Sequence, residues 1–258
     1  MSVLVISACL VAGSLIGFLG GVLGIGGGLI AIPALVLLLD MSQQLAQGTA
    51  LVMVLPTIMM AVRQYNQKVR IDKRVAGAGA VGAVLFTWVG AQLALGIAHS
   101  TLQISFAIFL FFVAVFYVYR IVRPVAVSTA NSTVQGAGVR LTPRRSAILG
   151  MVSGTLGGFF GVGGAVLAVP ILTSVFRLPQ TVAQALALAM VIPGSMMALL
   201  TYGMAGQTNW WVGIPLAIGS LLFVPVGVRL AYRLPERRLR AAFAAMLFGT
   251  VVLLMAGV

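Results

Sequence analysis

The stretch GGVLGIGGGLIAIPAL, from Gly20 to Leu35, returns almost unchanged as GGFFGVGGAVLAVPIL, from Gly157 to Leu172. The similarity continues without a gap, and 22 of the 49 positions that pair Gly17–Tyr65 with Gly154–Tyr202 are identical. So much identity at one constant offset indicates that the chain contains two copies of one unit. In membrane proteins, duplicated units often build a transport pathway at the boundary between the copies.

Composition predicts a membrane protein. Of the 258 residues, 61% are hydrophobic and only 7% are charged, whereas a soluble domain carries about 25% charged residues. Apolar runs of about 20 residues recur along the chain, as in a polytopic all-α membrane protein. The N-terminus lacks a basic start and a small-residue cleavage site, so we expect it to be retained as the first membrane segment.

The repeat and the apolar runs together divide the chain into two similar halves. Each half is predicted to be a glycine-broken hairpin, either re-entrant or made of two short helices, followed by three transmembrane helices. The expected ranges are 1–119 for repeat one (hairpin 3–39, helices 44–62, 75–95 and 102–119), 120–145 for a cytoplasmic linker, and 146–258 for repeat two (hairpin 147–176, helices 180–202, 210–230 and 240–256).

The basic residues predict the orientation. Fifteen of the sixteen Lys and Arg residues lie in three segments, 63–74, 120–145 and 229–240, which the positive-inside rule assigns to the cytoplasm. The segments 96–101 and 203–209 contain no Lys or Arg and are expected to face outward. Because the charges lie in short loops, the formal charge of +13 indicates contact with membrane lipid and no nucleic-acid partner.

Equivalent loops of the two halves therefore lie on opposite sides, which is the signature of an inverted-topology repeat. The segment 147–176 must then cross the membrane an even number of times, so it folds back on itself. Eight single crossings would instead leave the arginines of 229–240 outside. The predicted protein is a multi-pass protein of the cell inner membrane with both termini extracytoplasmic.

The glycine-rich tips of the two hairpins are the first candidate substrate site. Each precedes a helix whose N-terminal amides and positive dipole end would point to the middle of the membrane and attract an anion. The alternative is that these glycines only allow close helix packing. The candidate residues are Gly24, Gly26, Gly27, Gly28, Gly161, Gly163 and Gly164.

Glutamines on the following helices are the second candidate. Gln47 and Gln184 lie four residues after Gln43 and Gln180, so each pair shares one helix face. The inner carboxamides either bind substrate or join helices, and for the outer pair we expect interfacial capping. Thr49 adds a hydroxyl in the first copy only, so the predicted site is not symmetric.

Four prolines repeat inside apolar segments, where each would make a gating hinge or a static kink. They are Pro33 and Pro56 in the first copy, and Pro170 and Pro193 in the second.

The acidic residues argue against several functions. Asp40, Asp72 and Glu236 all lie at loops, so no carboxylate is expected to serve a proton relay or cation site within the membrane. His99 lies in an outward loop, where we expect it to be solvated. The sequence contains no recognisable catalytic constellation, so we predict neither an enzyme nor a cofactor or metal site.

The doubled glycine phrase with its trailing proline, followed by Gln47-Gly48-Thr49-Ala50, resembles the TauE/SafE sulfite exporter family over the whole chain. The resemblance implies a prokaryotic inner-membrane carrier for small sulfur-containing anions, namely sulfite, sulfoacetate or a related organosulfonate. Export by alternating access around the paired tips is the expected mechanism. A channel-like facilitator and a non-transporting scaffold are the alternatives; the exact anion, direction, coupling ion and oligomeric state stay open.

Overall fold

The structure, a computed structural model, describes residues 3–67, 72–122 and 141–256, and all regular secondary structure in these ranges is helical. Ten helices follow one another along the chain. They are α1 (Val3–Leu23), α2 (Gly28–Leu39), α3 (Gln43–Asn66), α4 (Lys73–Leu95), α5 (His99–Val122), α6 (Pro143–Phe160), α7 (Ala165–Ser174), α8 (Gln180–Met204), α9 (Trp210–Arg233) and α10 (Glu236–Ala256). Helices α5 and α6 thus extend into both ends of the predicted linker, whose residues 123–140 lie outside the described ranges.

Six of the described helices are long and apolar enough to cross a membrane: α1, α3, α4, α5, α8 and α9. Large apolar side chains on their outer faces are exposed, among them Leu85 at 61%, Phe112 at 66% and Leu222 at 66%. Such a surface would be unstable in water and is suited to lipid. The prediction of an all-helical, multi-pass membrane protein is therefore confirmed.

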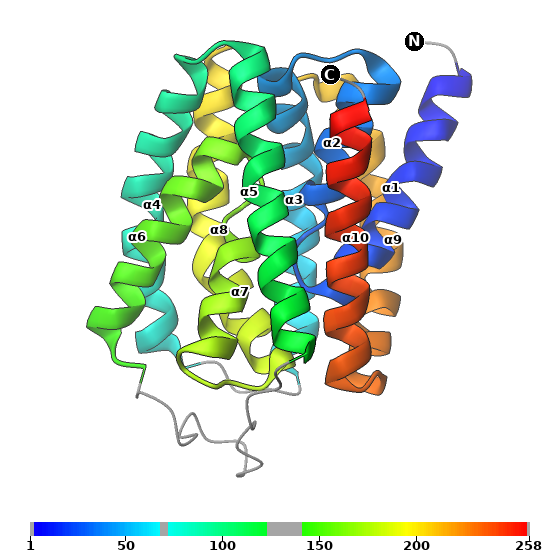
Figure 1. The fold of residues 1–258 in the computed structure, drawn as a ribbon. Coiled ribbons are helices and arrows are strands. Elements are labelled where there is room, and N and C mark those ends of the chain that lie inside the picture. Colours follow the sequence, from blue (N-terminus) through cyan, green and yellow to red (C-terminus); the bar gives the residue numbers. More distant parts are fainter. Residues whose placement is uncertain (1–2, 68–71, 123–140, 257–258) are drawn as a thin grey trace.

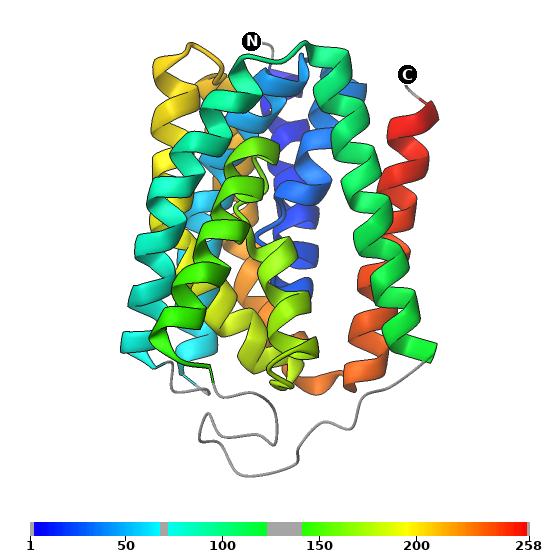
Figure 2. The same cartoon turned by 60° about the vertical axis from the view of Figure 1, so that its left-hand side comes forward.

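The helix ends gather at two opposite ends of the bundle. Figure 1 shows the beginning of α1 and the end of α10 at one end, and Figure 2 shows that the connections α4–α5 and α8–α9 lie at that same end. The connection α9–α10 and the ends of α5 and α6 that flank residues 123–140 lie at the opposite end. Asp40 after α2 and Arg177 after α7, which occupy equivalent repeat positions, both adopt a left-handed backbone, with φ of 49° and 52°.

The two halves of the chain interlock. The most extensive helix contacts are α1 with α9 and α4 with α6, followed by α4 with α8, α3 with α9 and α3 with α8. Each of these pairs joins one half of the chain to the other. Glycines allow the close approach: a Cβ on Gly17 would overlap the backbone of Ser220, and one on Gly158 would overlap the carbonyl of Thr87. Helices α3 and α8 lie at the centre, and α5 and α10 pair side by side at the flank (Figures 1 and 2).

Candidate functional site

Two glycine turns interrupt the helical bundle. Turn one is the segment 24–27 between α1 and α2, and turn two is the segment 161–164 between α6 and α7. Their glycines adopt positive φ, which L side chains avoid. The angles agree closely between the turns: 66°, 77° and 83° at Gly24, Gly26 and Gly27, and 67°, 77° and 72° at Gly161, Gly163 and Gly164.

Each turn leads directly into a buried helix N-terminus. Helix α2 begins after Gly27 and α7 begins after Gly164, and neither of these residues supplies a side-chain cap. The first amides of a helix have no carbonyl acceptor within that helix. Because residues 24–29 and 161–166 are all buried, the amides at the starts of α2 and α7 point into the protein interior together with the positive ends of two helix dipoles.

The two turns lie against each other. A Cβ placed on Gly28, the first residue of α2, would lie 3.5 Å from the Cα of Val162 and 3.7 Å from the carbonyl oxygen of Gly161. The side chain of Val54 on α3 contacts both turns, because its Cγ1 would lie 3.3 Å from a Cβ on Gly26 and 3.6 Å from a Cβ on Gly163. The structure therefore brings the two predicted glycine clusters side by side.

The inner glutamines cross between the halves. Gln47 of α3 packs on turn two, where a Cβ on Gly161 would lie 2.6 Å from its Cβ. Gln184 of α8 packs on turn one, where a Cβ on Gly24 would lie 2.5 Å from its Cγ. Both glutamines are fully buried. Each half thus supplies the glutamine that touches the glycine turn of the other half.

Two buried tyrosines hold these glutamines in place. The hydroxyl of Tyr202 donates to Oε1 of Gln47 at 2.7 Å and is 3.0 Å from the carbonyl oxygen of Gly158. The hydroxyl of Tyr65 likewise donates to Oε1 of Gln184 at 3.1 Å and lies 3.1 Å from the carbonyl oxygen of Gly21. Tyr202 thereby links Gln47 to the backbone of α6 beside turn two. Tyr65 links Gln184 to the backbone of α1 beside turn one.

The outer glutamines and Thr49 lie in a different environment. Gln43 is buried and is not the cap of α3, because Ser42 precedes it and accepts from Leu45 N at 3.3 Å. His99 is exposed at the start of α5, in line with the expectation that it is solvated, and its Nδ1 also accepts from the backbone N–H of Gln43 at 2.8 Å. Gln180 is also buried. The Thr49 hydroxyl accepts from Asn209 N at 2.9 Å, which ties α3 to the connection before α9.

The four repeated prolines all lie inside helices that continue past them. Pro33 is in α2, Pro56 in α3, Pro170 in α7 and Pro193 in α8. A proline within a helix leaves one carbonyl without its usual amide partner. Helices α2, α3, α7 and α8 therefore each contain one position where the helical hydrogen bonding is interrupted.

Sequence reasoning missed three side chains at the turns: Tyr65, Tyr202 and Ser195. The two tyrosines end the aligned stretch and are identical in both copies, which was a usable signal. Ser195 is 1% exposed, and its Oγ would lie 3.1 Å from a Cβ on Gly163. Its repeat equivalent is Ile58, which packs on Gly26. That difference between the copies was visible in the sequence, but nothing in the sequence placed it at the turns.

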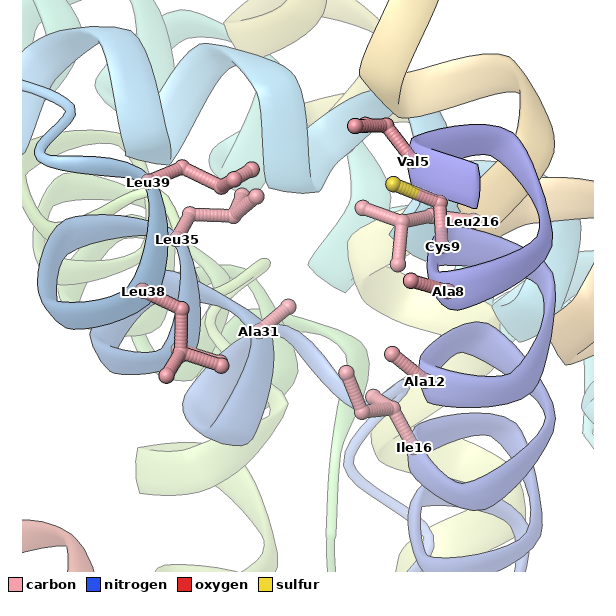
Figure 3. Close-up of a pocket in the computed structure, with 11 residues that line it drawn as sticks. Val5, Ala8, Cys9, Ala12, Ile16, Ala31, Leu35, Leu38, Leu39 and Leu216 are labelled. Atoms are coloured by element: carbon pink, nitrogen blue, oxygen red, sulfur yellow. The ribbon is translucent and has the colours of Figure 1, made fainter. Parts of the chain in front are cut away.

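A cavity lies between the two helices that flank turn one. It has a volume of about 280 Å³ between α1 and α2, and Figure 3 shows Leu35 and Leu38 of α2 opposite Ala8 and Cys9 of α1. A cavity of about 250 Å³ occupies the equivalent position between α6 and α7, with Phe176 among its lining residues. The first cavity is almost wholly apolar, so it offers nothing to an anion. Each cavity thus lies between the two helices that flank a glycine turn.

Comparisons with known proteins agree with this architecture. The family model described as sulfite exporter TauE/SafE matches residues 9–254. The probable membrane transporter protein YunE of Bacillus subtilis is 25% identical, with 95% of this chain and 93% of that protein covered. The probable membrane transporter protein MJ0441 of Methanocaldococcus jannaschii is 23% identical, and one from Xylella fastidiosa (strain Temecula1) is 26% identical; both alignments cover 95% of this chain and more than nine-tenths of the relative. No solved structure matches the chain. The chain belongs to the sulfite exporter TauE/SafE family of membrane transporters.

Proposed function

We propose that this protein is a carrier for small sulfur-containing anions, such as sulfite, sulfoacetate or a related organosulfonate, and that it exports them from the cell. The substrate site is formed by the paired glycine turns with Gln47 and Gln184, with Thr49 nearby. No enzymatic step takes part, because members of this family are membrane transporters.

One observation carries the proposal: two buried, uncapped helix N-termini meet at the centre of the bundle. The segments that build this site, 3–39, 41–62, 146–176 and 178–228, contain no Asp, Glu, Lys, Arg or His. Helix ends and amide donors therefore supply the electrostatic attraction there. Each helix N-terminus carries about half a positive elementary charge, so an anion is the ligand that this centre favours.

The proposed orientation rests on the distribution of charge. We assign the end of the bundle that bears the basic helix ends to the cytoplasm of an inner-membrane protein, so that both termini are extracytoplasmic. The reciprocal contacts of Gln47 and Gln184 support an inverted-topology repeat, because in each half this glutamine packs on the first glycine of the other half's turn. The two hairpins would then enter from opposite sides and meet at their glycine turns.

Alternating access requires that the site open to one side at a time. In the present conformation the turns, Gln47 and Gln184 are buried, as in an occluded state. The cavity between α1 and α2, and the cavity between α6 and α7 that Arg145 borders, leave room for α2 and α7 to move. The first cavity is lined by the beginning of α1 and the second by the beginning of α6. Because these two helices begin at opposite ends of the bundle (Figure 1), movement of one arm would open the site to one side only. The prolines at 33, 56, 170 and 193 are proposed hinges.

The test is uptake of labelled sulfite into proteoliposomes, with Gln47→Met as the site variant and Gln44→Met as its matched control. Gln44 is a buried neighbour on the same helix, but its Nε2 donates to the carbonyl of Ile97 at 2.8 Å, away from the turns. We expect saturable flux with counterflow in the wild type and the control, and a marked loss in folded Gln47→Met protein. Unsaturable flux without counterflow would favour a channel-like facilitator, and no flux above empty liposomes would favour a scaffold.

A further inference from the structure

We infer that the site is polarised and selects a singly charged oxyanion, whose charged head lies at turn two beside Ser195 and Gln47. This inference rests on the proposed anion transport and specifies both the substrate class and a specificity-determining residue. The predicted substrates are bisulfite and small alkanesulfonates, in preference to doubly charged sulfite, sulfate, thiosulfate or sulfoacetate.

The first observation is an unused hydroxyl at turn two. Ser195 is 1% exposed, and its Oγ forms no hydrogen bond within the described residues. A buried polar group without a partner is costly, so its retention calls for a ligand. The Oγ would lie 3.1 Å from a Cβ on Gly163, next to the start of α7. At the equivalent place on turn one, Ile58 presents only carbon to Gly26.

The second observation is an unused amide at the same turn. Gln47 packs on Gly161, its Oε1 is occupied by Tyr202, and its buried Nε2 has no partner in the described part of the chain. Gln184 at turn one is fully engaged, because its Nε2 donates to the carbonyl of Leu23 at 2.7 Å and its Oε1 accepts from Tyr65. Among the side chains that pack on the two turns, the two with an unpartnered donor, Ser195 and Gln47, therefore both lie at turn two.

Apart from the engaged Gln184, the side chains described at turn one are apolar. Val54 and Ile58 contact turn one. The Cγ2 of Val54 also lies 2.9 Å from the position that a Cβ on Gly28 would take. A substrate with an oxyanion at turn two would therefore present its other end to hydrocarbon. A methyl or other small alkyl group fits that wall, and so does the uncharged hydrogen-bearing side of bisulfite. A second charged group there would meet only the first amides of α2 and no free side-chain donor, so most of the cost of its burial would not be offset.

The available positive charge also matches a monoanion. Two helix N-termini of about half a charge each amount to about one elementary charge, and the site-forming segments contain no charged side chain. The cost of removing an ion from water rises with the square of its charge, so a dianion costs about four times as much to bury as a monoanion. Only half of its charge would be balanced by the two helix ends.

The experiment measures uptake of labelled methanesulfonate into proteoliposomes by wild type, Ser195→Ala, Ser195→Thr and the control Thr201→Val. Thr201 is a buried hydroxyl on the same helix that already donates to the carbonyl of Met197. We expect Ser195→Ala to raise KM about tenfold, as for loss of a hydrogen bond to a charged group. Ser195→Thr should restore the wild-type KM, and the control should not change it.

Two further measurements on the wild type need no variant. Sulfate, thiosulfate and sulfoacetate should compete weakly against methanesulfonate. Sulfite uptake should increase as the medium is made slightly acidic, because sulfite is then converted to bisulfite, whereas methanesulfonate uptake should not change. Dianions that compete as well as methanesulfonate, or a KM unchanged in Ser195→Ala, would overturn the inference and leave anion transport intact. Absence of any saturable anion flux in the wild type would overturn both.

Discussion

Gly164 offers the sharpest test of the glycine turns. Its φ is +72°, and a Cβ at this position would overlap the carbonyl oxygen of Ser153 and lie 3.3 Å from Cγ1 of Val191. The first of these neighbours is backbone on α6, which cannot rotate away as a flexible side chain would. Gly164→Ala therefore combines conformational strain with a forced separation of α6 from the start of α7.

The expected destabilisation follows from two terms. A left-handed backbone costs an L residue about 1–2 kcal/mol, and overpacking against a fixed neighbour costs about 1–3 kcal/mol. Gly164→Ala should thus lower the free energy of unfolding by about 2–5 kcal/mol. Gly206 isolates the first term, because its φ is +71° and nothing lies within 4 Å of its Cβ position. Gly206→Ala should cost only about 1–2 kcal/mol.

Gly77 supplies the opposite control. It lies inside α4 with nothing within 4 Å of its Cβ position, so Gly77→Ala should stabilise the protein by up to about 1 kcal/mol through helix propensity. The assay is reversible unfolding of the three purified variants in mixed micelles of mild detergent and dodecyl sulfate. The expected order of stability is Gly77→Ala above wild type, then Gly206→Ala, then Gly164→Ala. If Gly164→Ala were no less stable than Gly206→Ala, the close packing of turn two on α6 would be refuted.

The remaining predictions concern the residues that support the site. Tyr202→Phe should reduce anion flux more than Tyr65→Phe, because Gln184 keeps its bond to Leu23 whereas Gln47 loses the bond that orients it; equal losses in the liposome assay would contradict this. His99→Ala should destabilise the protein by about 0.5–1.5 kcal/mol, because it removes the acceptor for the first amide of α3, and an unchanged unfolding midpoint would count against that bond. Cys9, the only cysteine, is 7% exposed and lines the cavity between α1 and α2. A membrane-permeant maleimide should therefore label it faster when transport substrate is cycling than at rest, and identical labelling rates measured by mass shift would argue against movement of α2.

The sequence carried enough information for the helical architecture and for the two glycine segments that the structure brings side by side. Apolar runs and sparse charge predict long membrane helices without reference to packing. The sequence could not separate two kinds of glycine, however. Gly17 allows α1 to approach α9, whereas Gly26 adopts positive φ in a turn, and both appear in the same repeated stretch. Only the path of the backbone distinguishes them.

Side-chain partners between the halves could not be predicted either. Gln47 and Tyr202 are 155 residues apart, and their contact depends on how α3 and α8 are rotated against each other. The sequence alignment of the copies shows that Ser195 replaces Ile58, but the meaning of that difference depends on α8 turning this position toward turn two. Thr49 was expected at the substrate because of its hydroxyl, yet its oxygen accepts from Asn209. The local sequence pattern predicts which residues share one face of a helix. Which helix packs against that face depends on the tertiary structure.

The interlocking of the halves also has a consequence for biogenesis. Gly17 of α1 packs against Ser220 of α9. Helix α1 therefore cannot form this contact until α9 has been synthesised, about 200 residues later. At about 5–20 residues per second, that delay is on the order of 10–40 s. Throughout this interval the glycine-lined face of α1 has no native neighbour, and the long sequence separation makes the final pairing slow. Insertion machinery or lipid must therefore shelter the first helices until the last third of the chain arrives.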